Sequence, residues 1–120
     1  MKPTAIKSAS HPVTNQVIFD SIKPLIKEGV KILDFGAGHG HMSQKIGEEA
    51  SRKDIQLDQC IYPCEIVPEE FQYEKVECQK IDTDSIIPFP DDFFDVVYAI
   101  EVLEHTPRPY DFIKEAKRVM

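Results

Sequence analysis

The loop D-F-G-A-G-H-G, residues 34–40, combines residue types and a spacing suited to binding a small ligand through the backbone. Glycine tolerates a positive φ and has no Cβ, so a ligand can approach the main chain at Gly36, Gly38 and Gly40. A carboxylate just before the loop, Asp34, would repel a phosphate and attract a cationic or hydroxyl-bearing group. A dinucleotide loop needs G-x-G-x-x-G, and His41 occupies the position of its last glycine. The loop therefore predicts a cofactor site that is not designed for pyrophosphate.

The segments on either side of this loop predict a strand followed by a helix. Residues 30–33, V-K-I-L, are typical of a strand buried in a parallel sheet. After the loop, Met42, Ile46 and Ala50 recur on one face of a helix that runs to about residue 51, with Glu49 facing water. In open α/β sheets such a turn opens on the crevice beyond the carboxyl ends of the strands, where nucleotides bind.

A second amphipathic helix is expected before the first strand, beginning at Thr14 as N-cap. Pro24 should kink or weaken it, and Gly29 is the natural stop. Residues 1–13 are expected to be a flexible arm, and residues 14–120 one domain. The apolar positions of this helix are Val17, Ile18, Ile22, Leu25 and Ile26.

Composition excludes several classes of function. The chain has 120 residues, 42% of them hydrophobic, which suits one globular domain. The net charge of −7 and the scattered lysines argue against a nucleic-acid partner. No apolar run approaches the ~20 residues of a membrane span, so no membrane partner and a cytoplasmic location are expected. Three cysteines without an export signal indicate reduced thiols, and a single C-x3-C pair is too weak to predict a metal site.

The second and third strands are expected to end in acids. Ile55 and Leu57 alternate with polar residues and lead to Asp58, which lies 18 residues past Gly40, near the spacing of an acid that binds ribose hydroxyls. The alternative register ends the second strand later and passes that contact to Glu65. Residues 63–73 are then a loop or a short helix. A third strand leads to residues 82–84, D-T-D.

A second strong block extends from residue 87 to the end of the chain. It reads I-P-F-P-D-D-F-F-D-V-V-Y-A-I-E-V-L-E-H-T-P-R-P and then a helical pattern. Two prolines and two aspartates predict a rigid turn before a buried strand at residues 94–100. His105 is a candidate general base because imidazole titrates near neutrality, although it could equally help to cap the next helix or order the loop.

Together these motifs resemble the class I S-adenosylmethionine-dependent methyltransferases. The resemblance rests on D-x-G-x-G-x-G, on L-P-F-x-D-x-x-F-D-V-V and on E-V-x-E-H-x-x-x-P, and covers roughly residues 14–120. It implies an acid at the amino-acid end of the cofactor, an acid on the ribose, adenine contacts after the third strand and a floor after the fourth. The positions it implies are Asp34, Gly36, Ala37, Gly38, Gly40, Asp58, Asp82, Thr83, Ala99 and Ile100, with His105 as the catalytic candidate.

The resemblance also predicts the fold. It implies an α/β, Rossmann-like parallel sheet with flanking helices; a complete family sheet has seven strands, and this chain ends in the helix after the fourth. The expected strand order is therefore 3-2-1-4, with strand four as an open edge that a second copy or a partner chain covers.

The resemblance implies S-adenosylmethionine as cofactor, S-adenosylhomocysteine as product and a small-molecule acceptor. Two other functions stay open. One is a cofactor-binding or regulatory module without transferase activity, because the substrate half is missing. The other, a nicotinamide-dependent oxidoreductase, is disfavoured by His41 and by the acid before the loop.

Overall fold

A computed structural model describes residues 12–83, 85–100 and 106–120 of the chain, and it shows a four-stranded parallel sheet between helices. The strands are β1 (Ile32–Phe35), β2 (Ile61–Glu65), β3 (Gln79–Lys80) and β4 (Val96–Tyr98). Their order in the sheet is β3-β2-β1-β4, and every pairing is parallel. The expected Rossmann-like order 3-2-1-4 is confirmed.

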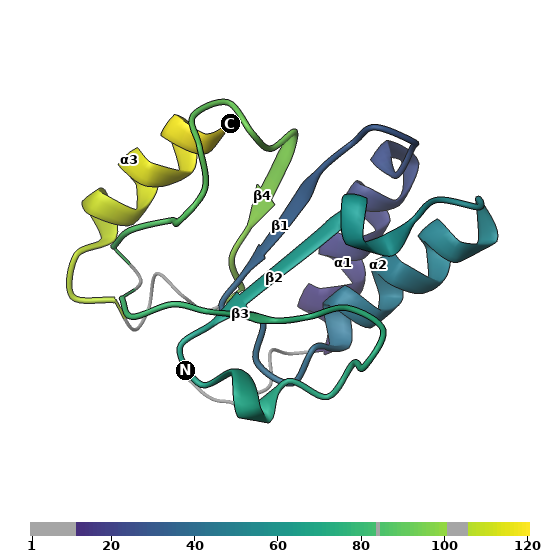
Figure 1. The fold of residues 1–120 in the computed structure, drawn as a ribbon, viewed down its shortest axis with the longest axis horizontal. Coiled ribbons are helices and arrows are strands. Elements are labelled where there is room, and N and C mark those ends of the chain that lie inside the picture. The colour runs from purple at the N-terminus through teal and green to yellow at the C-terminus, as the bar shows by residue number, and fades with distance from the viewer. Residues whose placement is uncertain (1–11, 84, 101–105) are drawn as a thin grey trace.

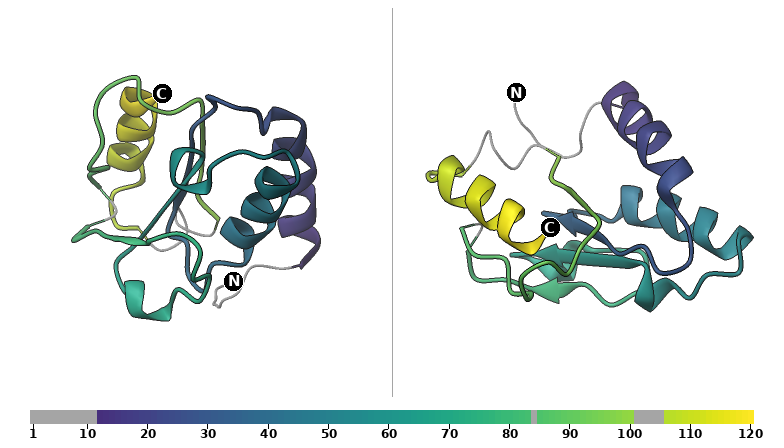
Figure 2. Two further views of the ribbon diagram at one scale, coloured as in Figure 1. Left: turned by 45° about the vertical axis from the view of Figure 1, so that its right-hand side comes forward. Right: turned by 90° about the horizontal axis from the view of Figure 1, so that it is seen from above.

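Three α-helices cover the two faces of this sheet (Figure 1). Helices α1 (Pro12–Ile22) and α2 (His41–Arg52) lie on one side, and α3 (Pro109–Val119) lies on the other, as the turned views also show (Figure 2). Each side has its own buried cluster. One joins Phe19 of α1 and Ile46 of α2 to Ile32, and the other joins Phe112 of α3 to Leu33 and its neighbours.

The alternation of β1 explains the two clusters. Successive residues of a strand point to opposite faces, so Ile32 faces α1 and α2 while Leu33 and Phe35 face α3. All four residues of β1 are buried, as expected for a central strand of a parallel sheet. The aromatic rings of Tyr62, Phe89, Phe93 and Phe94 extend the α3 side, with neighbouring centroids 4.8–5.9 Å apart.

The first helix differs from its prediction in start and in face. It begins at Pro12 rather than at Thr14, and the rest of the expected arm, residues 1–11, lies outside the described residues. It ends at Ile22, and Pro24 lies in a following 3-10 helix, Lys23–Leu25. The α-helix stops there because proline has no N–H to donate and its ring clashes with the preceding turn. Val17 and Leu25 are exposed, and Phe19 takes a core position instead.

The other strands and helices differ from their predictions mainly in length. Strand β4 is shorter than the predicted 94–100, and α2 ends at Arg52 as expected. Glu49 of α2 was predicted to face water and is buried, because Arg52 pairs with its carboxylate at 3.0 Å and Lys53 lies 3.8 Å away.

The prediction for the second strand is wrong. Residues 57–59 form a 3-10 helix, and the strand is Ile61–Glu65 with Pro63 inside it. Pro63 has no N–H to donate. The pairing of β2 with β3 begins only at Cys64, so no residue of β3 requires a hydrogen bond from Pro63. Asp58 therefore precedes the strand instead of ending it.

Candidate functional site

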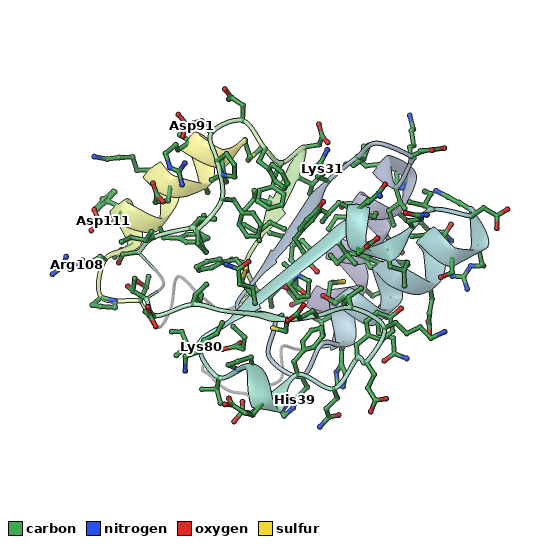
Figure 3. All side chains as sticks on the ribbon, viewed as in Figure 1. Lys31, His39, Lys80, Asp91, Arg108 and Asp111 are labelled. Carbon is green, nitrogen blue, oxygen red and sulfur yellow. The ribbon has the colours of Figure 1, made fainter. Side chains whose placement is uncertain are left out.

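The glycine loop lies where the expected site should be, at the carboxyl end of β1. Gly36 N and Ala37 N donate to the carbonyl oxygen of Cys64 at 3.0 and 2.9 Å, which fastens the loop to the neighbouring strand β2. Figure 3 shows the polarity of the sheet: Lys31, just before β1, lies at one end of the molecule, and His39 in the loop lies at the other. Gly40 has φ +93° and is the N-cap of α2, so the strand–loop–helix arrangement is confirmed.

The loop has an open side at Gly38. A Cβ built there would meet no atom within 4 Å, and its φ of +58° is a conformation that glycine adopts without strain. At Gly40 the corresponding space is taken by the Phe71 ring, whose nearest carbon lies 2.8 Å from the position of such a Cβ. A ligand can therefore approach the main chain at Gly38, while Gly40 serves close packing.

Glu65 ends β2 beside this loop. One of its carboxylate oxygens accepts a hydrogen bond from Gly38 N at 2.8 Å, and the other accepts from Ile66 N at 2.7 Å and Val67 N at 3.2 Å. Asp58 is exposed in the 3-10 helix at the opposite end of the strand. The structure thus places Glu65, the alternative considered from the sequence, beside the glycine loop, and it places Asp58 at the opposite end of β2.

Two further predicted segments lie at the same end of the sheet, where the strands finish. Asp82 and Thr83 come one residue after β3, and the intervening Ile81 N donates to the carbonyl oxygen of Glu65 at 3.0 Å, which brings them beside β2. Asp82 is exposed, and Thr83 Oγ1 accepts from Ser85 N at 3.1 Å. Ala99 and Ile100 follow β4 and are half-buried.

Asp34 is buried beneath the loop, with 3% of its surface exposed. Ser43 Oγ of α2 donates to Asp34 Oδ2 at 2.6 Å. Burial raises the pKa of the Asp34 carboxyl to about 6; the Ser43 and Tyr98 hydroxyls act in the opposite direction, and the nearby Glu65 carboxylate adds to the rise. A cation bound at the loop would favour the charged form of this carboxyl.

The sequence did not reveal the parts played by Ser43 and Tyr98. Both looked like ordinary residues of a helix and a strand, and only the fold brings them to Asp34. The sequence contains one signal of this contact. Tyr98 is the last residue of β4 and Asp34 is the last but one of β1, so the two lie side by side once these strands are known to pair.

The segment after β2 covers one side of the loop. His39 Nδ1 lies 3.1 Å from the carbonyl oxygen of Glu70, and Gln72 N donates to the carbonyl oxygen of His39 at 2.9 Å. The His39 and His41 rings are 6.4 Å apart. Among residues 12–83, 85–100 and 106–120, no group of three or more His, Cys, Asp or Glu side chains could hold a metal ion. His105 lies outside the described residues.

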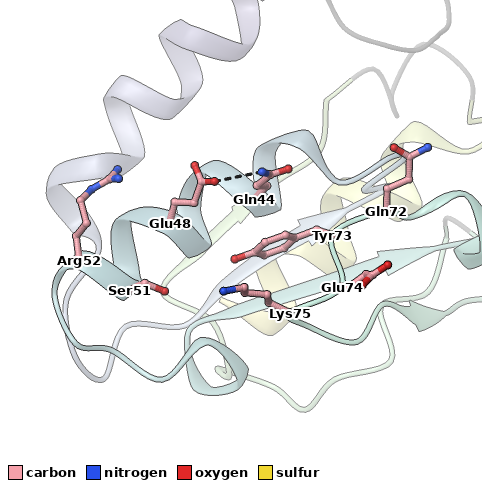
Figure 4. A pocket seen from close by; sticks show the side chains of 8 residues that line it. All are labelled: Gln44, Glu48, Ser51, Arg52, Gln72, Tyr73, Glu74 and Lys75. Atoms are coloured by element: carbon pink, nitrogen blue, oxygen red, sulfur yellow. Dashed lines mark hydrogen bonds between the residues drawn. The ribbon is translucent and has the colours of Figure 1, made fainter.

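A polar cavity of about 590 Å³ lies elsewhere, between α2 and residues 72–75 (Figure 4). Gln44 and Glu48 of α2 face Tyr73 and Lys75 across it, and Gln44 Nε2 donates to Glu48 Oε2 at 3.1 Å. None of the predicted cofactor residues lines this cavity. We therefore place the candidate site at the strand ends and not here.

Comparison with known proteins gives matches to methyltransferases. A family model described as "Methyltransferase domain" matches residues 33–120. The sterol 24-C-methyltransferase erg6 of Aspergillus fumigatus is 34% identical over 99 residues, which is 79% of this chain and 26% of that protein. The 27-O-demethylrifamycin SV methyltransferase of Amycolatopsis mediterranei is 29% identical over 105 residues, 79% of this chain and 36% of that protein. The chain thus spans about a quarter to a third of these relatives.

Solved structures share the fold. The YcgJ protein of Bacillus subtilis has a TM-score of 0.73 at 21% identity, covering 92% of this chain and 47% of that one. A SAM-dependent methyltransferase from Aquifex aeolicus has a TM-score of 0.62 at 20% identity, covering 92% and 68%. The [4+2]-cyclase SpnF has a TM-score of 0.64 at 23% identity, covering 87% and 40%.

Proposed function

The chain belongs to the methyltransferase domain family, and from this premise we propose that it is the cofactor-binding part of an S-adenosylmethionine-dependent methyltransferase. The observation that supports this most is that an open glycine loop and three acids, Asp34, Glu65 and Asp82, lie together at the carboxyl ends of the strands. Open α/β sheets bind nucleotides at this end. The acids suit a ligand with positive charge and hydroxyl groups and no phosphate.

In this proposal each strand end has one task. Gly38 leaves room for the ligand at the loop, with Gly36, Ala37 and Gly40 shaping it, and Asp34 faces the positive end of the cofactor. Glu65, in place of Asp58, accepts hydrogen bonds from the ribose hydroxyls. Asp82 and Thr83 bind the adenine ring, and Ala99 and Ile100 form the floor beside the methionine part.

Methyl transfer asks little more of the protein. S-adenosylmethionine, when bound, supplies an electrophilic methyl group. The residues of the chain hold it in place and exclude water. Orientation of this kind can supply a large part of the reduction of the activation barrier. His105 stays a proposal either as general base or as a residue that orders its loop.

We propose a small molecule as methyl acceptor. Two relatives carry names of enzymes acting on a sterol and on a rifamycin, which are small organic molecules.

We also propose a cytoplasmic protein whose β4 edge is covered by a second copy. The described cysteines are free thiols, and none of the described helices is long and apolar enough to cross a membrane. Strand β4 ends the sheet on the side away from β3, and an open strand edge is prone to pair with another strand.

The test of cofactor binding is calorimetric titration with S-adenosylhomocysteine. We expect micromolar binding, as is usual for such cofactors, and a loss of at least about tenfold, or ~1.4 kcal/mol, in Asp82→Ala and in Glu65→Gln. Asp58→Asn is the matched control, because Asp58 is an exposed acid at the opposite end of β2, and it should bind like wild type.

Failure would take one of two forms. If the folded wild-type chain does not bind S-adenosylhomocysteine, the cofactor proposal is wrong for this chain. If Asp58→Asn loses affinity while Glu65→Gln keeps it, the cofactor is bound in another register.

A second candidate is a binding or regulatory module without transferase activity. The fold alone does not require methyl transfer, because a solved structure with the same fold is named a [4+2]-cyclase. S-adenosylhomocysteine binding is expected under both candidates. Methyl transfer to a small acceptor, followed with a labelled methyl group in a screen of acceptors, would separate them.

A further inference from the structure

Asp34, Ser43 and Tyr98 form a buried polar cluster within an otherwise apolar core. Their exposed fractions are 3%, 0% and 8%. The three residues come from β1, α2 and β4, and the surrounding side chains include Ile32, Met42 and Ile46. A buried hydroxyl or carboxyl costs free energy unless it forms a hydrogen bond. For packing alone, phenylalanine in place of Tyr98 and alanine in place of Ser43 would therefore suit this apolar core better.

The sheet register brings the Tyr98 side chain next to that of Asp34. The two residues are directly paired between β4 and β1, and paired residues of neighbouring strands project to the same face. Ser43 reaches the same carboxylate from the first turns of α2 and donates to Oδ2 at 2.6 Å. Tyr98 Oη is buried and has no hydrogen-bond partner within the described part of the chain, and Asp34 and Ser43 are the groups whose charge and hydroxyl act on the Tyr98 pKa.

The charge of this cluster is unbalanced. The titratable groups that interact electrostatically with Asp34 are Tyr98 on β4 and Glu65 and Cys64 on β2, with Cys78 just before β3. Within the described residues, none of the groups acting on the Asp34 carboxyl is a cation. A carboxylate with two hydroxyls and no counter-ion, next to an open glycine loop, is suited to a cationic ligand.

We propose that Tyr98 and Ser43 are positioning residues, whose hydroxyls hold the Asp34 carboxylate in place for the positively charged end of a ligand at the glycine loop. This inference rests on the proposed cofactor binding and deepens it. Tyr98 and Ser43 act through Asp34, so their effect depends on the ionisation of that carboxyl. A hydroxyl that donates to a carboxylate stabilises the charged form and lowers the pKa of the acid.

The test compares Tyr98→Phe and Ser43→Ala with wild type in two measurements. Carbon-13 NMR follows the Asp34 carboxyl through a pH titration without ligand, and both variants should raise its pKa. Calorimetry with S-adenosylhomocysteine should then show a loss of about threefold to tenfold in affinity at pH 6, shrinking to less than about twofold at pH 8, where the carboxyl is ionised in every form.

The matched control is Tyr62→Phe. Tyr62 is on β2, and its ring packs in the aromatic cluster with Phe89 and Phe94 on the α3 side of the sheet, away from Asp34. The Tyr62→Phe substitution removes the hydroxyl of a tyrosine in a strand, as Tyr98→Phe does. We expect wild-type values of both the Asp34 pKa and the affinity.

The outcomes separate this inference from the proposed function. An Asp34 pKa that does not change in Tyr98→Phe and Ser43→Ala overturns the inference, whatever the affinity. A pKa that rises while the affinity loss is equal at pH 6 and pH 8 overturns it too, because the effect of the hydroxyls on binding would then not depend on the ionisation of Asp34. If wild type binds no S-adenosylhomocysteine at either pH, the proposed function and this inference both fail, although the NMR titration still reports on the hydroxyls.

Discussion

A buried carboxyl without a counter-ion makes folding sensitive to pH at a single residue. The pKa of Asp34 is about 6 in the folded chain, above its ordinary value of 3.8, so the folded protein retains a proton that the unfolded chain releases between these values. The contribution of this group to stability is fully present below pH 4 and is lost as pH rises through 6. The loss amounts to ~3 kcal/mol.

Asp34→Asn should remove this dependence, because asparagine is neutral throughout. In urea unfolding at several pH values, the stability of the variant relative to wild type should increase by about 3 kcal/mol between pH 4 and pH 7. Asp58→Asn, a change at an exposed acid, should show no such trend. A constant difference for Asp34→Asn over this range would show that the carboxyl titrates normally.

Two glycines of the loop should respond differently to alanine. Gly40→Ala forces a Cβ into the Phe71 ring as well as a strained φ of +93°, and we expect a loss of about 2–4 kcal/mol in the free energy of unfolding. Gly38→Ala strains only φ, so it should lose about 1–2 kcal/mol. Its Cβ projects into the open side of the loop, so Gly38→Ala should weaken S-adenosylhomocysteine binding. Thermal unfolding and calorimetry on both variants decide this, and equal stability losses would contradict it.

The strands and helices show which parts of the fold the sequence can predict. The apolar run at residues 30–33, the glycines and the apolar face of α2 predicted β1, the loop and α2 respectively, because their signals are local. The second strand was misplaced because Ile55 and Leu57 alternate like a strand while they pack as half-buried connectors, and because Pro63 looked like a loop residue. The Asp34 cluster could not be predicted, because Ser43 and Tyr98 meet Asp34 only through strand register and helix packing.

The side chain of Arg118 is one of the groups that join helix α3 to the turn before β4. Arg118 donates to Asp91 Oδ1 at 2.6 Å, to Glu115 Oε2 at 2.8 Å and to the carbonyl oxygen of Ile87 at 2.8 Å, and its side chain is 33% exposed. A network of this kind contributes more than an isolated surface ion pair. Arg118→Ala should therefore lower the free energy of unfolding by about 1–2 kcal/mol.

The comparison variants make this prediction specific. Arg118→Lys cannot form the forked contacts of a guanidinium, so it should recover only part of the loss. Arg52→Ala removes an arginine that is 65% exposed and pairs within its own helix, and it should change stability by less than about 0.5 kcal/mol. Chemical denaturation measures all three. Equal losses in Arg118→Ala and Arg52→Ala would mean that the contacts of the Arg118 side chain with the turn do not stabilise the fold.

For the molecule as a whole, the arrangement of layers separates the site from the sheet edges. The loop and the acids lie at the carboxyl ends of the strands, and the two buried clusters lie on the two faces of the sheet. The unpaired backbone groups of the outer strands β3 and β4 lie along the two sides of the sheet. Changes at an edge can therefore alter assembly without altering the cofactor site.

This separation makes the proposed pairing of β4 testable. Val96 N donates to the carbonyl oxygen of Lys31 on the β1 side, so the N–H of the next residue, Val97, points to the open edge. Val97→Pro removes that donor, leaves the hydrogen bond of Val96 intact and should block pairing with a second copy. In sedimentation experiments over a range of concentrations, wild type should self-associate and Val97→Pro should shift toward monomer. Lys80→Pro on the other edge strand is the matched control and should associate like wild type. A wild-type chain that stays monomeric at the highest concentration would mean that the β4 edge needs no second copy to cover it.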